Sequence, residues 1–482
     1  MPLSLPPIRP LAMTKGSIAL FLLLGCFGSA LAATDPAPLA FPTAEGYGKR
    51  TVGGRGGRVI AVTHLGDSGP GSLRSAVEAS GPRTVVFRVS GTITLDRPLR
   101  IRQPFLTVAG QTAPGDGICI RRQPIVIEAD EVILRHLRVR LGDESGADAD
   151  AITARYVRNL MLDHLSVGWS IDETLSVYHC KNVTVQWCLV AESLYDSNHV
   201  KGQHGYGGIW GSDFGTYHHN LLAHHSSRNP RFASGCGHTD YRNNVVYNWG
   251  FQSCYGGENQ QLNDPRFNVS QINMVANYYQ PGPATKEGEV SFRIAGPSSR
   301  RGSGDYGKWY ISGNVVAGNA RVTADNWDGG VQPQGGPNFL SGLKLDQPWA
   351  AMPIRQHTAE EAYSLVLERA GATLPRRDAI DTRIIREVRE GRATYEGAAY
   401  VRDHPSNTRT GKSGIIDSQK DAGGWPDLRS LPAPADSDHD GMPDDWEKQH
   451  GLDPSDGNDG NRLAADGYTL LEKYLHSFDS QL

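Results

Sequence analysis

The chain has 482 residues, of which 38% are hydrophobic and 21% are charged, and its formal net charge is −4. This composition is typical of a soluble globular protein and excludes a disordered chain, and the 56 glycines fall in short turn-like groups, which excludes a collagen-like repeat. The length allows one large domain with an appendage.

The first 32 residues are typical of an export signal. Two basic residues precede an apolar run at 18–27, and residues 30–32 (Ala-Leu-Ala) fit a small-residue cleavage site. The run is too short to span a bilayer, so we expect a secreted, extracellular protein without a membrane partner. A lipoprotein signal at Cys26 and a true start at Met13 are alternatives.

Residues 33–345 consist of short β-branched runs separated by Gly, Asn, Asp and Ser. Equivalent runs begin near residues 132, 160, 183, 216 and 241, at steps of 23 to 33 residues. Such a repeat predicts an all-β solenoid, a right-handed parallel β-helix, rather than a β-sandwich with its frequent tight hairpins. Asparagines recur after the runs, and we expect them to hydrogen-bond along the stacked turns. They are Asn220, Asn243, Asn244, Asn277 and Asn314.

Carboxylates gather on two neighbouring coils of this solenoid. Asp148 and Asp150 lie on one side of an extended segment, and Asp172, with Glu173 beside it, follows about one coil later. Residues one coil apart in a parallel solenoid stack at roughly 5 Å. We therefore expect Asp148, Asp150 and Asp172 to meet at one calcium ion; ordinary surface acids beside turns are the alternative.

Two arginines three residues apart follow in the segment 227–232, where Arg228 and Arg231 flank a proline. Planar guanidinium groups suit the capture of carboxylates, although ordinary surface arginines are the alternative. The body as a whole is slightly basic, which suits a polyanionic ligand, and we expect no nucleic-acid partner. Histidines crowd the same region, and we expect most of them to be stacked or hydrogen-bonded in the core. They are His164, His199, His204, His218, His219, His224 and His225.

Residues 346–435 predict helices and a wrap around the solenoid. Thr358 and Glu361 form a capping box, and Ile380, Ile384 and Val388 form a second helical stripe. We expect these helices to pack on the coils. After cleavage five cysteines remain, for which disulfide pairing and buried packing are both open. They are Cys119, Cys180, Cys188, Cys236 and Cys254.

The tail, residues 436–482, holds 12 acidic and three basic residues. Its first twelve residues carry oxygen ligands at the spacing of an EF-hand loop, with Gly441 at the sharp turn. The spacing predicts a structural calcium site; a solvated acidic linker is the alternative. The ligands are Asp436, Asp438, Asp440, the Met442 carbonyl, Asp444 through water, and Glu447.

Several further segments carry a family resemblance. They are 41–48 (FPTAEGYG), 53–57 (GGRGG), 67–74 (DSGPGSLR), 109–115 (AGQTAPG) and the pair Asp163-His164. Together with the motifs above they resemble the pectate lyases of polysaccharide lyase family 1 over most of the mature chain, in a secreted form with a C-terminal EF-hand-like loop.

The resemblance implies calcium-dependent β-elimination of an acidic plant cell-wall polysaccharide, polygalacturonate. It makes Arg228 the base that removes the ring C5 proton, with Arg231 and Lys201 as substrate contacts. Two positions depart from the family pattern: Ala233 stands where a second arginine is usual, and Ser176 where a fourth calcium carboxylate is usual.

Three rival functions are compatible with the sequence. A β-helix hydrolase would use paired carboxylates and a bound water, and the sequence shows no acid beside Arg228 to support it. A pectin lyase would act on the methyl ester without calcium, and a non-catalytic protein would only bind the cell wall. We expect a monomer. The preferred methylation, endo or exo action, the pH optimum and the number of catalytic calcium ions are left open.

Overall fold

The computed structural model describes residues 1, 38–405 and 411–481. The predicted export signal, its cleavage site, Cys26 and Met13 therefore lie outside the described residues. The described residues from 38 onward belong to one compact unit. Within the described ranges, none of the helices combines the length and the apolar character needed to cross a membrane.

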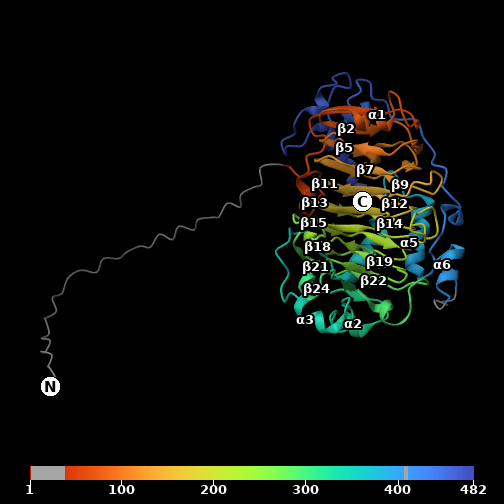
Figure 1. The fold of residues 1–482 in the computed structure, drawn as a ribbon. Helices are drawn as coiled ribbons and strands as arrows, with labels where there is room; N and C mark the ends of the chain where they lie inside the picture. Colours follow the sequence, from red (N-terminus) through yellow and green to blue (C-terminus); the bar gives the residue numbers. More distant parts are fainter. Residues whose placement is uncertain (2–37, 406–410, 482) are drawn as a thin grey trace. The chain divides into compact units, whose positions relative to one another are not determined.

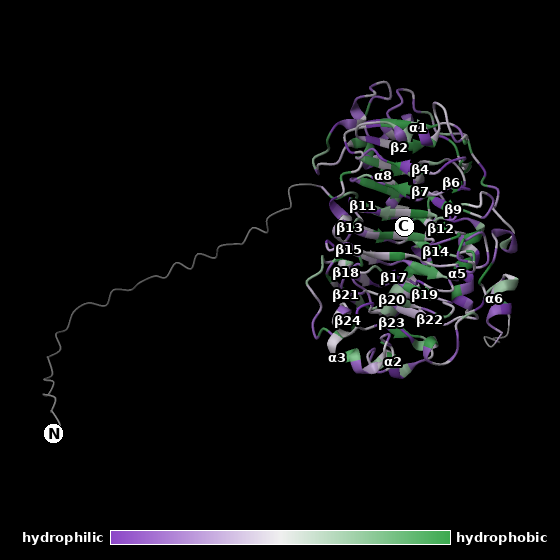
Figure 2. Ribbon diagram, viewed as in Figure 1, coloured by the Kyte–Doolittle hydropathy of each residue, from purple (hydrophilic) through white to green (hydrophobic). Residues whose placement is uncertain are grey.

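The compact unit is a parallel β-helix, as predicted. In the described residues, its strands pair in parallel and form one sheet of 16 strands and a second sheet of 9 strands. Successive coils lie one below the other from β2 to β24 (Figure 1). Hydrophobic residues are concentrated in these strands, while the connecting loops are mostly hydrophilic (Figure 2).

The strands of the larger sheet are β1 (Arg58–Val62), β2 (Arg83–Phe87), β4 (Leu99–Ile101), β5 (Leu106–Ala109), β7 (Ile125–Ile127), β8 (Val132–Arg135), β10 (Ile152–Arg155), β11 (Arg158–Asp163), β13 (Leu175–Gln186), β15 (Ile209–His218), β17 (Arg231–Phe232), β18 (Gly237–Arg242), β20 (Cys254–Gly256), β21 (Ser270–Val275), β23 (Ala295–Pro297) and β24 (Lys308–Ser312). Most coils contribute two consecutive strands to the larger sheet, such as β10 and β11. The second sheet closes each coil. Its strands are β3 (Gly91–Thr94), β6 (Ile118–Arg121), β9 (Arg138–Arg140), β12 (Ser166–Gly168), β14 (Leu189–Ala191), β16 (Leu221–Ala223), β19 (Val245–Tyr247), β22 (Tyr278–Gln280) and β25 (Val315–Val316).

The register confirms the repeat that the sequence predicted. Val132, Leu160 and Val183 are partners in successive coils, and Gly215 and Thr239 continue the same column. Their aliphatic neighbours fill the interior as one continuous hydrophobic core. The uneven steps between partners are taken up by loops, and these loops carry the candidate site.

A ladder of buried asparagines stabilises the turn between the two sheets. The Asn244 Oδ1 accepts from the Asn220 backbone N–H at 3.0 Å, and Asn277 and Asn314 extend the chain at 2.9 Å per step. This confirms the predicted hydrogen bonding along stacked turns. Asn243 occupies the corner before the ladder with a φ of 55°, and its side-chain amide also reaches the next coil, where it donates to the Ala276 carbonyl at 3.0 Å.

Helices cover the second sheet and both ends of the coils. They are α1 (Leu73–Glu78), α2 (Ala320–Ala324), α3 (Leu340–Leu343), α4 (Ala359–Arg369), α5 (Ala379–Glu390), α6 (Ala398–Asp403), α7 (Asp444–Gln449) and α8 (Leu470–Ser477). The capping box of Thr358 and Glu361 opens α4, and Ile380, Ile384 and Val388 of α5 pack against the second sheet. The predicted helices and their packing are confirmed.

The tail packs on the first coils. Arg55 pairs with Glu472 at 2.7 Å and Arg135 pairs with Asp479 at 2.8 Å, and Met442 is buried beside Ala109. The five cysteines are buried free thiols, which decides between the two open alternatives in favour of packing.

Candidate active site

The candidate site lies where loops return to the larger sheet. Asp150 precedes β10, Glu173 precedes β13, and Arg228 precedes β17 by a few residues. Bridges from Glu173 to Tyr206 and from Tyr206 to Ser227 place these loop ends in neighbouring coils. Parallel stacking therefore brings residues that are 78 positions apart in sequence, from Asp150 to Arg228, to one edge of the sheet.

Three carboxylates converge at this edge. Oxygens of Asp150, Asp172 and Glu173 all lie within 4.8 Å of one another, and the Glu173 backbone N–H donates to Asp150 Oδ1 at 3.2 Å. Burial, together with the negative charge of Asp172, raises the pKa of Asp150 to about 7. Oxygen donors in this number and spacing fit a hard divalent cation such as calcium, which would offset the repulsion.

Two histidines hold the second carboxylate. His204 Nε2 lies 2.9 Å and His199 Nε2 3.4 Å from Asp172 Oδ1, and the two rings stack at 3.7 Å between centroids. The His204 contact lowers the pKa of Asp172 despite its burial. Asp148 lies against His199, with 3.2 Å between Oδ1 and Nε2. Asp148 is thus joined to the site through an imidazole, whereas Glu173 joins the carboxylate group directly.

Arg228 faces the carboxylates from the next coils. Its guanidinium contacts the Glu173 carboxylate, lies 4.5 Å from the centroid of the Tyr206 ring, and donates from Nε to the Tyr255 hydroxyl at 3.3 Å. The side chain is 19% exposed and Glu173 only 5%. The sequence showed no acid beside Arg228, and this expectation is wrong, because Glu173 reaches it from the neighbouring coil.

The other predicted substrate contacts lie around this core. Arg231 Nη2 pairs with both oxygens of the buried Glu258, at 2.8 and 3.0 Å. Lys201 is exposed, and its backbone N–H donates to His199 Nδ1 at 3.0 Å. Arg231 therefore has its charge compensated within the protein, while the Lys201 ammonium lies at the rim of the site.

The tail brings its predicted ligands together. Ligand oxygens of Asp436, Asp438 and Asp440 lie within 4.8 Å of one another, as do those of Asp440, Glu447 and Asp459, and Gly441 adopts a φ of 91° at the sharp turn. Both Glu447 oxygens are buried without a hydrogen-bond partner among the described residues, as is one carboxylate oxygen of each of the four aspartates. Orphaned buried carboxylate oxygens in this arrangement fit a bound cation.

Two tail residues act differently from an ideal loop. Asp444 accepts hydrogen bonds from the Ser437 backbone N–H and hydroxyl, both at 2.8 Å, so it closes the loop. Asp459 comes from outside the twelve-residue motif and was missed, because spacing within a motif carries no information about a later loop. Burial and mutual repulsion raise the pKa values of Asp440 and Glu447 to about 7.

No family model matches the chain, but curated relatives do. It is 35% identical over 452 residues to a probable pectate lyase C of Emericella nidulans, covering 93% of this chain and 94% of that protein. It is 33% identical over 468 residues to a probable pectate lyase C of Aspergillus fumigatus, covering 96% and 98%. The chain belongs to the pectate lyase family.

The fold also resembles solved structures of pectate lyases. A thermostable pectate lyase has a TM-score of 0.47 and 15% identity, covering 69% of this chain and 97% of its own. A pectate lyase bound to a hexasaccharide has a TM-score of 0.48 and 14% identity, covering 70% and 99%. The family assignment rests on the curated relatives and not on these distant likenesses.

The structure explains the two departures from the family pattern. Ala233, where a second arginine is usual, is 3% exposed and belongs to the hydrophobic core. An arginine would not fit there without disrupting the coil. Ser176, where a fourth carboxylate is usual, is fully buried, and its hydroxyl accepts from the Ile209 backbone N–H at 3.3 Å. Ser176 therefore supplies no carboxylate to the group around Asp150, whereas Glu173 does supply one.

Proposed function

We propose that this protein is a secreted pectate lyase that cleaves polygalacturonate by calcium-dependent β-elimination. The observation that carries the proposal is the convergence of Asp150, Asp172 and Glu173 opposite Arg228. It occurs in a chain whose relatives at 33–35% identity are named probable pectate lyases. Three carboxylates alone repel a uronate, and only a cation between them and the substrate makes this edge a binding site.

Each residue has a chemical role in this proposal. Asp150, Asp172 and Glu173 donate carboxylate oxygens to calcium, and His199 and His204 fix the orientation of Asp172. Bound calcium would supply a bridge to the substrate carboxylate, which makes the ring C5 proton more acidic.

Arg228 removes that proton as the base. Arg231 and Lys201 contact substrate carboxylates, and Asp148 completes the calcium site.

The same proposal covers the rest of the molecule. Residues 1–32 are the export signal, 33–345 the catalytic β-helix, 346–435 the wrap and 436–482 a calcium-binding tail. The protein acts as a monomer outside the cell. In the tail, Asp436, Asp438, Asp440, the Met442 carbonyl and Glu447 bind calcium with Asp459 as an additional ligand. Asp444 reaches the ion through water.

The test is an assay of the purified protein on polygalacturonate with calcium and with a chelator. We expect an ultraviolet-absorbing unsaturated product in calcium and none in the chelator. A hydrolase is the second candidate, because the pKa of Asp150 is raised while that of the adjacent Asp172 is lowered, a division typical of an acid–base pair. New reducing ends without the absorbance would establish hydrolysis and overturn the lyase.

A further inference from the structure

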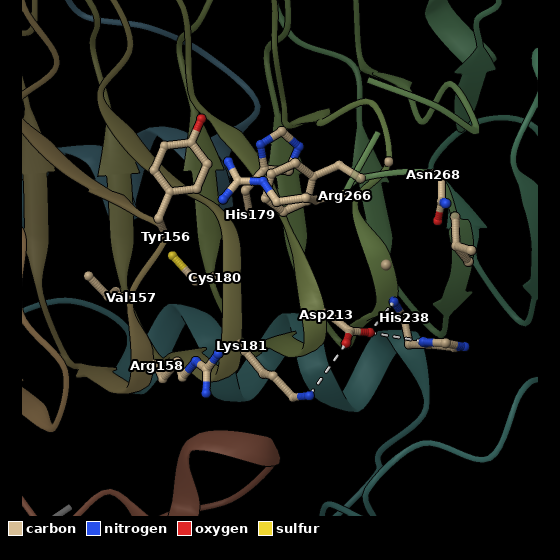
Figure 3. Close-up of a pocket in the computed structure, with 14 residues that line it drawn as sticks. Tyr156, Val157, Arg158, His179, Cys180, Lys181, Asp213, His238, Arg266 and Asn268 are labelled. Carbon is tan, nitrogen blue, oxygen red and sulfur yellow. Dashed lines mark hydrogen bonds and ion pairs between the residues drawn. The ribbon is translucent and has the colours of Figure 1, made fainter. Parts of the chain in front are cut away.

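A basic pocket lies at the other end of the strands that carry the candidate active site. Its volume is about 420 Å³, and the lining includes Tyr156, Arg158, His179, Lys181 and Arg266. Tyr156, His179 and Arg266 gather at one end of the pocket, and Arg158 and Lys181 lie at the other with Asp213 and His238 (Figure 3). None of the roles proposed above uses these residues.

The pocket and the active site lie at the two ends of β10. Asp150 precedes β10 and Tyr156 follows it, and a strand of this length spans about 13 Å at 3.3 Å per residue. On the next coil, Glu173 precedes β13 and Tyr178 lies within this strand. Arg155 at the end of β10 pairs in register with Tyr178. The Arg155 guanidinium lies 4.9 Å from the Tyr178 ring centroid. Arg155 and Tyr178 therefore lie on the strands between the two sites.

The charged lining of the pocket consists of three cations, Arg158, Lys181 and Arg266, and one carboxylate, Asp213. Lys181 has one carboxylate, Asp213, at 4.0 Å, and Arg266 pairs with Asp264 at 2.7 Å. In the ranges 38–405 and 411–481, neither an ion pair nor a side-chain hydrogen bond is found for the guanidinium of Arg158. The Arg158 guanidinium is therefore available to a carboxylate of a ligand.

Aromatic rings hold two of the guanidinium groups in place. Arg266 lies 5.7 Å from the Tyr156 ring centroid and 5.3 Å from that of Phe267, and Arg155 lies 5.6 Å from Tyr156. His179 stacks on Phe267 at 3.9 Å. Cation–π contacts of this kind order long side chains before a ligand binds, which reduces the entropy lost on binding.

We propose that this pocket is a second binding site for uronate carboxylates, which anchors the galacturonan chain beyond the catalytic site. The identity of the polymer rests on the proposed function; the presence of an anion-binding surface does not. A polymer that occupies both sites gains affinity because the second contact is intramolecular. Short oligosaccharides that reach only one site do not gain in this way.

The test compares two double variants with equal loss of charge. Arg158→Gln with Lys181→Gln removes two cations from the pocket, and Arg386→Gln with Arg389→Gln removes two exposed cations from α5 on the opposite sheet. Affinity for polygalacturonate is measured by calorimetry in chelator, so that turnover does not interfere. We expect the pocket variant to bind roughly fivefold to tenfold more weakly, with a smaller difference at high salt, and the α5 variant to bind like the wild type.

Two results would overturn the proposal. Either the pocket variant binds the polymer like the wild type, or the α5 variant loses as much affinity, which would indicate non-specific attraction. If the double variant does not fold, as judged by its melting temperature, the single Lys181→Glu change takes its place and should weaken binding in the same assay. Lyase activity of the wild type in calcium is measured separately. Its absence would refute the proposed function and leave the binding comparison valid.

Discussion

Replacing Glu447 by glutamine should have different effects on the stability of the protein with and without calcium. The Glu447 side chain is fully buried, and burial with the charges of Asp438, Asp440 and Asp459 raises its pKa from 4.5 to about 7. Each unit of this pKa shift corresponds to about 1.4 kcal/mol. After allowance for solvent near the loop, the ionised carboxylate destabilises the metal-free fold by on the order of 2 kcal/mol. The glutamine variant lacks that charge and should be more stable than the wild type in chelator.

Calcium should remove or reverse this difference. A ligand at a hundredfold excess over its Kd stabilises the folded state by about 2.7 kcal/mol, and Glu447 occupies the bidentate position of the loop. The variant should lose most of this gain, which slightly exceeds the roughly 2 kcal/mol that it gains without the buried charge, so in calcium it should melt at or about one degree below the wild type. Asp445→Asn is the control, because Asp445 lies in the same helix with a side chain that is 92% exposed.

The pH dependence gives an independent check of the same residue. A raised pKa means that Glu447 holds its proton more tightly in the folded, metal-free chain, so the contribution of this group to stability is fully present below pH 4.5 and is lost as the pH rises toward 7. The slope should be shallower in Glu447→Gln. Thermal unfolding in chelator and in calcium across this range is the assay. Equal melting temperatures of variant and wild type in both media, or a variant that loses turnover but keeps its melting point, would refute the assignment of the loop.

Three further predictions concern the site and its support. Arg228→Lys should abolish turnover with folding and polymer binding retained, because lysine keeps the charge but not the planar fork; near-normal kcat would remove Arg228 as the base. Glu173→Gln should weaken calcium binding in calorimetry and lower kcat, and an unchanged calcium affinity would show that Glu173 serves only as a partner of Arg228. Glu387→Gln should reduce the loss of stability in acid. Burial raises the pKa of Glu387, but the contacts with His224 and Arg383 have the larger effect and lower this pKa to about 2. This gives on the order of 3 kcal/mol that is present above pH 4.5 and lost as the pH falls toward 2; parallel pH–melting curves for variant and wild type would contradict it.

The fold was predictable because its signals are local and repeated. The recurring strands from residue 132 onward and the capping box before α4 depend on residues within one coil or one turn, and the asparagine ladder repeats one residue at the same place in successive coils. A stack of similar coils then follows, since each coil leaves an apolar edge that only another coil can cover.

The candidate site was only partly predictable. Asp150, Asp172 and Arg228 were identified, but the Glu173 contact with Arg228 and the pairing of Arg231 with Glu258 were not. Both contacts join different coils, and the loops between the coils differ in length, so spacing along the chain does not determine which side chains face each other.

The sequence by itself thus determined the solenoid, the helices and the ligand spacing of the tail loop, because hydrophobic period, caps and turn residues act over a few positions. Only the tertiary structure decided that Glu173 completes the carboxylate group, that His199 and His204 hold Asp172, and that Asp459 joins the tail site. These contacts depend on the direction in which side chains leave separate loops. That direction is determined by packing between coils, which no single segment encodes.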